Sequence, residues 1–280
     1  MTRLLHLLLL FALAAVLVTA GEPPRRIVSI NLLTDQWLLV LAPRDRVASV
    51  TWLSLDPAYS PLWREARAVP ENRGTAEEVL RFKPDLVLAG RYAATETVRM
   101  LERLGVRVVV FDYPPDFEGI AAQAREIGAL IGEPEAAEQF VVSMQVRLDR
   151  VRASRPAHPL KVLEYGQNGW THGRGTVLDL LLREAGHVNI AAEHGVEWMA
   201  QLPLEQVVRM RPEGFIIPRR NDGAPALAHG VFDHAAFRAV AARGLVVTMP
   251  PGTTDFGGPA TIDALEYLAA ALRGEGNSAR

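Results

Sequence analysis

The sequence predicts an α/β protein of two similar lobes, each with a central, mostly parallel sheet flanked by helices, joined by one long interlobe helix. Apolar strand-like runs alternate with helical segments, which is typical of a parallel sheet covered on both faces. The stretch "TAEEVLRFKPDLVLAG", residues 75–90, returns as "LPLEQVVRMRPEGFIIP", residues 202–218, which indicates two similar halves. Between the two copies, residues 134–153 carry apolar positions at intervals of three and four, as one long helix does.

The first twenty residues differ from the rest of the chain. One basic residue, Arg3, precedes an apolar run over residues 4–18, and small residues follow. This pattern predicts a signal peptide over residues 1–20 with cleavage near Ala20–Gly21. The run is too short for a membrane span. The chain has no cysteine, which excludes a lipoprotein anchor, disulfides and thiolate metal sites. We therefore expect an exported protein of the periplasm.

The composition is that of an ordinary soluble protein. The 280 residues are 49% hydrophobic and 22% charged, with a formal net charge of −2. This balance gives no support for a nucleic acid or a membrane surface as partner. The length is sufficient for two modest cores.

The first lobe is expected over residues 25–115. Its helices are predicted at 34–42 with Thr34 as cap, at the start of the first repeat copy with Thr75 and Glu78 as a capping box, and at 95–105, where Gly105 ends the helix. An irregular loop rich in aromatic residues is expected at 51–66. The four buried strands are predicted at 26–31, 46–50, 85–89 and 106–112.

Helical material is expected over residues 116–155, with one helix at 117–131 and the long linking helix after it. The second lobe is expected over residues 160–275, and its tail is expected to fray. Its strands are predicted at 161–166, within the second repeat copy and at 244–249. Its helices are predicted at 176–185, at the start of that copy, at 234–242 and at 260–272, and the stretch "QNGWTHGRG", residues 167–175, is expected to be a loop.

Candidate ligand residues lie in loops after the predicted strands, because ligands of open α/β sheets bind at the carboxyl ends of strands. Two arginines, Arg219 and Arg220, directly follow a buried strand and suit carboxylate or catecholate oxygens, although solvated loop charge explains them nearly as well. Aromatic side chains suit a large, flat ligand, although each one alone could pack under its own loop. The four aromatic candidates are Trp52, Tyr59, Tyr92 and Trp170.

Signatures of catalysis are absent from the sequence. There is no Gly-x-Ser-x-Gly, no Walker A segment and no Gly-x-Gly-x-x-Gly. The seven histidines are not spaced in a way that forces ligands to converge on a metal. We therefore expect no enzyme activity, no resident cofactor and no metal site made by the protein alone.

The two repeated glutamates, Glu77 and Glu205, each fall in the first turn of a predicted helix. The helix dipole favours an acid there by roughly 0.3–1 kcal/mol, which explains either residue alone. It does not explain the same offset in both halves. One carboxylate on each lobe would make a two-point docking surface for a partner of complementary charge.

The chain resembles the periplasmic solute-binding proteins of ABC importers, in the branch for iron–siderophore, vitamin B12 and haem. The resemblance is carried by "RIVSINLLTDQWLLVL", "AEEVLRFKPDLVLAG", "LGVRVVVFD" and "LPLEQVVRMRPEGFIIP", which span most of residues 26–275. It implies that Glu77 and Glu205 meet arginines on the two permease subunits. It also implies that the helix at 134–153 is a stiff hinge.

The resemblance leaves the ligand open among three metal chelates. A ferric siderophore is favoured, with Arg219, Arg220 or Arg174 as its contacts. Vitamin B12 would use aromatic walls such as Trp52 and Trp170. For haem, the resemblance implies a tyrosine ligand, and the candidates are Tyr59, Tyr92 and Tyr113.

The leading hypothesis is therefore binding without chemistry. A monomer captures a metal chelate in the interlobe cleft and docks on an ABC permease dimer, whose ATPase drives uptake. Two rivals come from other classes: a periplasmic enzyme on a bilobed fold, and a sensor domain that signals to a membrane partner.

Overall fold

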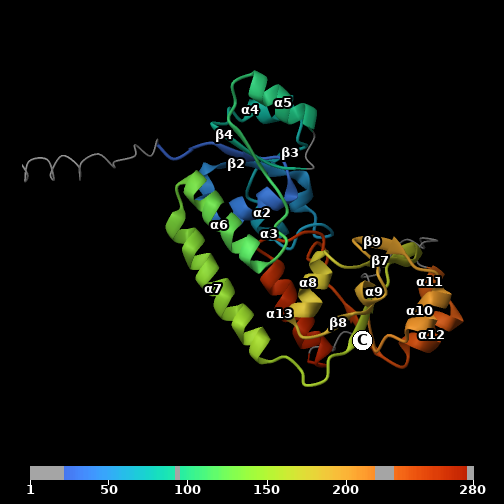
Figure 1. Cartoon of the computed structure of the whole chain (residues 1–280). Helices are drawn as coiled ribbons and strands as arrows, with labels where there is room; N and C mark the ends of the chain where they lie inside the picture. The colour runs from blue at the N-terminus through green and yellow to red at the C-terminus, as the bar shows by residue number, and fades with distance from the viewer. Residues whose placement is uncertain (1–21, 92–94, 218–229, 276–280) are drawn as a thin grey trace, which may run out of the picture.

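The protein consists of two α/β lobes with a pair of long helices along one side (Figure 1). The computed structural model describes residues 22–91, 95–217 and 230–275. The predicted signal peptide, Tyr92, Arg219 and Arg220 lie outside these residues. Each lobe has its own sheet, which confirms the predicted fold class. Among the described helices, none is both long and apolar enough to cross a membrane.

The first lobe is built on a five-stranded sheet in the order β3-β2-β1-β4-β5, and each pair of neighbouring strands is parallel. Four strands match the predicted ones, and β3 is an additional edge strand. The short β1 is wholly buried, as expected for a central strand covered on both faces. The strands are β1 (Ile27–Ser29), β2 (Val47–Thr51), β3 (Glu71–Asn72), β4 (Leu86–Gly90) and β5 (Val108–Phe111).

The first helix begins earlier than the sequence predicted, and Thr34 is not its cap. Asn31 is the N-cap, because its side chain accepts a hydrogen bond from the Leu33 N–H at 3.0 Å. Thr34 is buried within the first turn, and its hydroxyl donates to the Asn31 carbonyl oxygen at 3.0 Å. The predicted N-cap was wrong because asparagine and threonine both favour this position, and the sequence offers one of each.

The segment 51–66 is partly helical, not wholly irregular as predicted. The helix of the first repeat copy is capped by Thr75 as expected, but Glu78 accepts from the Arg73 N–H instead of completing the capping box at Thr75. The helical elements of this lobe are α2 (Leu32–Leu41), η1 (Arg44–Arg46), η2 (Trp52–Leu55), α3 (Trp63–Ala66), α4 (Ala76–Arg81) and α5 (Thr95–Arg103).

Two long helices, α6 (Phe117–Ile131) and α7 (Pro134–Ala153), lead from the first lobe to the second. Both match the predicted bounds. Gly132 separates them in the left-handed region, with φ 77°, which favours glycine. The buried face of α7 is Ala137, Val141, Met144, Leu148 and Val151. This face belongs to one hydrophobic core that includes residues of both lobes.

The second lobe repeats the topology of the first. Its sheet order is β11-β10-β6-β8, which corresponds to β5-β4-β1-β2 of the first lobe. An antiparallel ribbon, β7 (Trp170–His172) with β9 (Met199–Gln201), replaces the predicted loop at 167–175. The sheet strands are β6 (Lys161–Glu164), β8 (Val188–Asn189), β10 (Gly214–Ile217) and β11 (Leu245–Thr248). The helical elements are η3 (Gln167–Gly169), α8 (Val177–Glu184), α9 (Ile190–Glu193), α10 (Leu204–Met210), α11 (Gly230–Asp233), α12 (Ala235–Ala241) and α13 (Thr261–Leu272).

The repeated basic-Pro-acidic turn has the same structural role in both lobes. Lys83 and Arg211 each end a helix with a positive φ, at 48° and 52°. The acid two residues later then accepts from the backbone at the start of the neighbouring strand. Asp85 accepts from the Arg25 and Arg26 N–H groups at 2.7 and 3.0 Å, and Glu213 accepts from the Lys161 N–H at 2.9 Å. The repeat therefore ties a helix end to the first strand of each sheet.

The loop between β11 and α13, which we call the strap (residues 249–260), joins the second lobe to the first. Gly252 packs so closely on the Tyr59 backbone that a Cβ would lie 2.1 Å from the Tyr59 carbonyl oxygen. A Cβ on Gly257 would lie 2.7 Å from the Pro114 carbonyl oxygen. The Phe256 ring stacks on Tyr113 with 5.5 Å between centroids. The strap is therefore a second connection between the lobes, beside α7.

We predict that Gly252→Ala weakens this seam. Gly252 has φ 70° and no space for a Cβ, whereas Gly195 has φ 83° with nothing within 4 Å of the added atom. Gly195→Ala should lower the free energy of unfolding by about 1–2 kcal/mol, because alanine disfavours a positive φ. Gly252→Ala should lower it by about 1–3 kcal/mol more, because its Cβ also clashes with the Tyr59 backbone. Urea unfolding of both variants checks this prediction. Equal losses of unfolding free energy in the two variants would contradict a tight seam.

Candidate functional site

A cavity of about 350 Å³ lies in the cleft between the two lobes. The first lobe contributes the segment that follows η2, and the second contributes β6, β7, the end of β10 and the strap. These are the carboxyl ends of sheet strands and the loops after them, where ligands of α/β folds bind. The lining residues are Ala58, Tyr59, Glu164, His172, Ile216, Ile217, Met249, Pro250, Pro251, Gly252, Thr254 and Asp255.

A carboxylate and an imidazole are paired on the second-lobe side of this cavity. The His172 Nδ1 meets the Glu164 carboxylate, which also accepts from the His172 backbone N–H at 3.1 Å. Both side chains are largely buried, with 23% and 16% of their surfaces exposed. This bond fixes the ring and leaves Nε2 without a described protein partner. In metal-bound histidines, one ring nitrogen donates a hydrogen bond to a carboxylate and the other binds the metal. The Glu164–His172 pair leaves Nε2 available in the same way.

The charge state of His172 depends on three influences. Burial of the ring opposes its charged form and is the largest single one. The hydrogen bond to Glu164 and the charges of Glu164 and Asp255 together outweigh burial, so the pKa of His172 is raised above its ordinary value. The imidazole therefore holds its proton to higher pH than a free histidine does.

The β7–β9 ribbon presents a row of side chains beside this pair. Successive side chains of a strand point to opposite faces, so Trp170 and His172 share one face. Their partners in the register are Gln201 and Met199. Trp170 is 43% exposed and Met199 48% exposed, whereas Thr171, on the other face, is fully buried. The face that carries His172 is therefore an accessible wall with an indole and a thioether.

The first-lobe wall of the cleft depends on a buried acid. Asp35 is fully buried in α2, and its carboxylate accepts from the Thr51 N–H at 3.0 Å, from the Ser54 hydroxyl at 2.7 Å and from the Thr51 hydroxyl. Burial raises the pKa of Asp35, while these hydrogen bonds oppose the rise. The bonds hold the turn that carries Trp52. The Trp52 ring meets Tyr59 edge to face, with 6.4 Å between centroids.

The predicted ligand residues are therefore only partly placed. Tyr59 lines the cavity, Trp52 contacts it, and Trp170 lies on the ribbon face that carries His172. Tyr92, Arg219 and Arg220 lie outside the described residues, so their part in the site remains a prediction. Arg174 is held by Glu197 at 3.1 Å and by the Ala192 carbonyl oxygen at 3.1 Å.

Sequence reasoning missed the Glu164–His172 pair and its neighbour Asp255. The sequence analysis placed Glu164 in a predicted strand and His172 in a predicted loop, and it named neither as a site residue. The one signal for this site in the sequence was "WTH", where the alternation of side chains is typical of a strand that carries Trp170 and His172 on one face. Within the described residues, no group of three or more His, Cys, Asp or Glu side chains could hold a metal ion.

Glu77 and Glu205 are both exposed and lie in the first turns of α4 and α10. Each helix precedes a parallel strand of its own sheet, so its first turn lies at the sheet edge where the strands end. This is the edge that bears the cleft in both lobes. Glu77 is paired with Arg81 at 2.6 Å, and both side chains are largely exposed.

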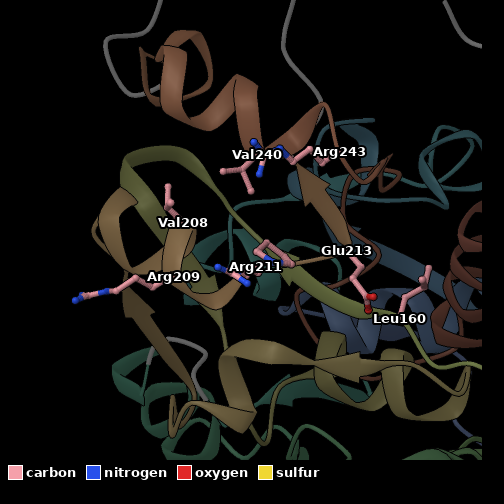
Figure 2. Close-up of a pocket in the computed structure, with 8 residues that line it drawn as sticks. Leu160, Val208, Arg209, Arg211, Glu213, Val240 and Arg243 are labelled. Atoms are coloured by element: carbon pink, nitrogen blue, oxygen red, sulfur yellow. The ribbon is translucent and has the colours of Figure 1, made fainter.

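A second and larger cavity, of about 1180 Å³, lies away from the cleft on the outer edge of the second lobe (Figure 2). It is lined by Leu160, Val208, Arg209, Arg211, Pro212, Glu213, Val240 and Arg243. It lies at the opposite sheet edge, where strands begin, and none of the predicted ligand residues lines it.

Two lobes that enclose a cavity of this kind define the class of two-lobed solute-binding proteins. The family model described as periplasmic binding protein matches residues 27–250, and the chain therefore belongs to that family. The family is a solute-binding class, not an enzymatic one. No curated protein matches the chain.

Several solved structures share the fold. The periplasmic haem-binding protein RhuT from Roseiflexus sp. RS-1, in apo form, is 23% identical with a TM-score of 0.73, over 89% of this chain and 98% of that one. A periplasmic haem-binding protein from Pseudomonas aeruginosa is 24% identical with a TM-score of 0.70, over 89% of this chain and 92% of that one. HutB of Vibrio cholerae, also described as haem-binding, is 18% identical with a TM-score of 0.74, over 88% and 98%.

We predict that Glu164→Gln lowers the pKa of His172, because burial then acts with less opposition. A pKa raised in the folded state adds stability that is present in full below the ordinary pKa of about 6.5 and is lost as pH rises through the folded pKa. The variant should lose this part of the pH dependence. An NMR titration of the His172 ring, with unfolding measured against pH, checks both points. Glu193→Gln, on the neighbouring α9, is the control, and an unchanged His172 pKa in Glu164→Gln would refute the pairing.

Proposed function

We propose that the mature protein captures haem, or a closely similar planar metal chelate, in the interlobe cleft and delivers it to an ABC permease. The observation that carries this proposal is that Tyr59 from one lobe and the carboxylate-held His172 from the other line a single cavity. A phenol oxygen and an imidazole nitrogen are both ligands of haem iron in proteins. The protein acts as a carrier and not as an enzyme.

The aromatic residues support a flat ligand. Trp52 and Trp170 stand on the two lobes with a large part of each ring exposed, and they offer rigid apolar area on either side of the cleft. The similar solved structures described as haem-binding support the same choice over a siderophore or vitamin B12. The siderophore expectation rested partly on Arg174, which is already engaged by Glu197.

We predict that the purified mature chain binds haem with a saturable change in its absorbance spectrum. His172→Ala and Tyr59→Phe should each weaken binding by tenfold or more, about 1.4 kcal/mol, because each removes a ligand of the iron. His158→Ala, an exposed histidine before β6, is the matched control and should bind as the wild type does. A ferric catecholate siderophore and cobalamin are titrated in parallel. Tighter binding of either one, or full haem affinity in both cleft variants, would overturn the choice of ligand.

The delivery step is proposed to use Glu77 and Glu205. Members of this family work with an ABC permease and its ATPase, and a periplasmic location follows from the family. Two exposed carboxylates at the cleft edge of each lobe would let one carrier engage both subunits of a permease dimer. Charge pairs of this kind set orientation and association rate.

We predict that the double variant Glu77→Lys/Glu205→Lys abolishes haem-dependent growth of an iron-starved strain but keeps its affinity for haem. Charge reversal places two lysines against permease cations, which is repulsive at both contacts. Glu135→Lys is the matched control, because Glu135 is also an exposed acid in the first turn of a helix, α7. It should lose the same helix-dipole stabilisation and still support growth. Normal growth with the double variant would remove the docking role.

A further inference from the structure

The cavity on the outer edge of the second lobe carries an excess of positive charge that the carrier function does not use. Three of its lining residues are arginines: Arg209, Arg211 and Arg243. In Figure 2, Arg211 lies at the centre of the lining group, Val240 and Arg243 lie on one side of it, and Arg209 points away. We propose that Arg211 and Arg243 form a binding site for a phosphate group, separate from the ligand cleft.

Among residues 22–91, 95–217 and 230–275, neither guanidinium of the pair is matched by an acid. In the part of the chain that the structure describes, no carboxylate lies within 4.0 Å of Arg211 or Arg243. The nearby acid, Glu213, points one carboxylate oxygen at the Lys161 backbone N–H, which it contacts at 2.9 Å. Elsewhere, arginines of this protein meet carboxylates, as Arg147 meets Glu266 at 3.0 Å. Two cations without a carboxylate partner in the described part of the chain, beside one cavity, favour an anion between them.

The backbone holds both arginines in fixed positions. Arg211 is left-handed and is followed by the buried Pro212, so its main chain has little freedom. Gly244 packs against the Glu213 carbonyl, where a Cβ would lie 2.5 Å away, and the Leu245 N–H donates to the same oxygen at 3.1 Å. Arg243, in the turn between α12 and β11, therefore lies beside the turn between α10 and β10 that bears Arg211. The main chain that carries both arginines is thus held in place by packing and hydrogen bonds.

The first lobe shows that the fold does not require this charge pair. Lys83 occupies the place of Arg211, with the same left-handed backbone. The repeat offset of 128 residues matches Gly214 to Leu86. Gly214 pairs with Leu245 and Val87 pairs with Val108, so Arg107 falls in the place of Leu245 and Gly105 in the place of Arg243. A Cβ on Gly105 would meet nothing within 4 Å. The first lobe therefore has no cation at the position that Arg243 occupies in the second lobe.

The chemistry of the cavity points to a phosphate that belongs to a larger molecule. Guanidinium forks match phosphate oxygens with paired hydrogen bonds. Val208, Val240 and Leu160 supply apolar surface beside the arginines, which suits the rest of such a molecule. The cavity is far larger than a free phosphate ion. A soluble phosphomonoester and a phospholipid headgroup share the required chemistry.

The test measures both sources with the full mature chain. Glycerol phosphate is titrated by calorimetry, and vesicles of phosphatidylglycerol are compared with vesicles of phosphatidylcholine by co-sedimentation. We expect saturable binding in one of the two arms. Arg211→Gln and Arg243→Gln should each weaken it by tenfold or more. Arg238→Gln, an exposed arginine on α12 outside the cavity, should stay within twofold of the wild type.

Two results would overturn the site. One is the absence of saturable binding to both glycerol phosphate and phosphatidylglycerol vesicles. The other is an equal loss with Arg238→Gln, which would show diffuse surface charge. If Arg211→Gln unfolds, Arg211→Lys replaces it; it keeps the charge and loses the fork, and an intermediate affinity is expected. Haem titration is independent of this site, so failure here leaves the carrier proposal untouched, and the reverse is also true.

Discussion

The buried face of α7 fixes the distance and angle between the two sheets. Its five core residues belong to a hydrophobic cluster that includes Trp37 in the first lobe and Leu265 in the second. Each buried aliphatic side chain of this kind contributes about 1.5–3 kcal/mol. Rotating one lobe against the other would therefore expose apolar surface along the whole helix. The cleft can form because this contact holds two separately built sheets with their carboxyl edges facing each other.

The strap contributes both to the lining of the cavity and to the contact between the lobes. Thr254 and Asp255 line the cavity, while Gly252 and Phe256 on either side of them contact the first lobe. Close to the seam, Gln36 is buried and its Nε2 has no hydrogen-bond partner among the described residues. A buried donor of this kind costs about 1–3 kcal/mol, and hydration on opening would recover it. Tight packing thus favours the closed seam, whereas this one polar group favours opening.

The fold could be predicted from the sequence because its signals are local. The spacing of Val141, Met144 and Leu148 defines α7 within one stretch of chain, and the repeated turn at Lys83 and Arg211 identifies the two halves. The site could not be predicted, because its chemistry depends on pairing across strands. Nothing within a few residues of His172 indicates that Glu164, eight positions away, lies against it. The aromatic candidates could be proposed because large rings in loops are visible residue by residue, and their role in binding stays a prediction.

The two lobes share one topology, so the positions where they differ are informative. Shared features, such as Asp85 and Glu213, hold strands in place and explain why the repeat exists. The β7–β9 ribbon, which carries His172, has no described counterpart in the first lobe, and Arg243 stands where the first lobe has an open glycine. Both differences place polar groups on cavities. In this duplicated fold, the contacts between helix ends and strands account for what the halves have in common, and the proposed ligands would account for the charged groups that only one half carries.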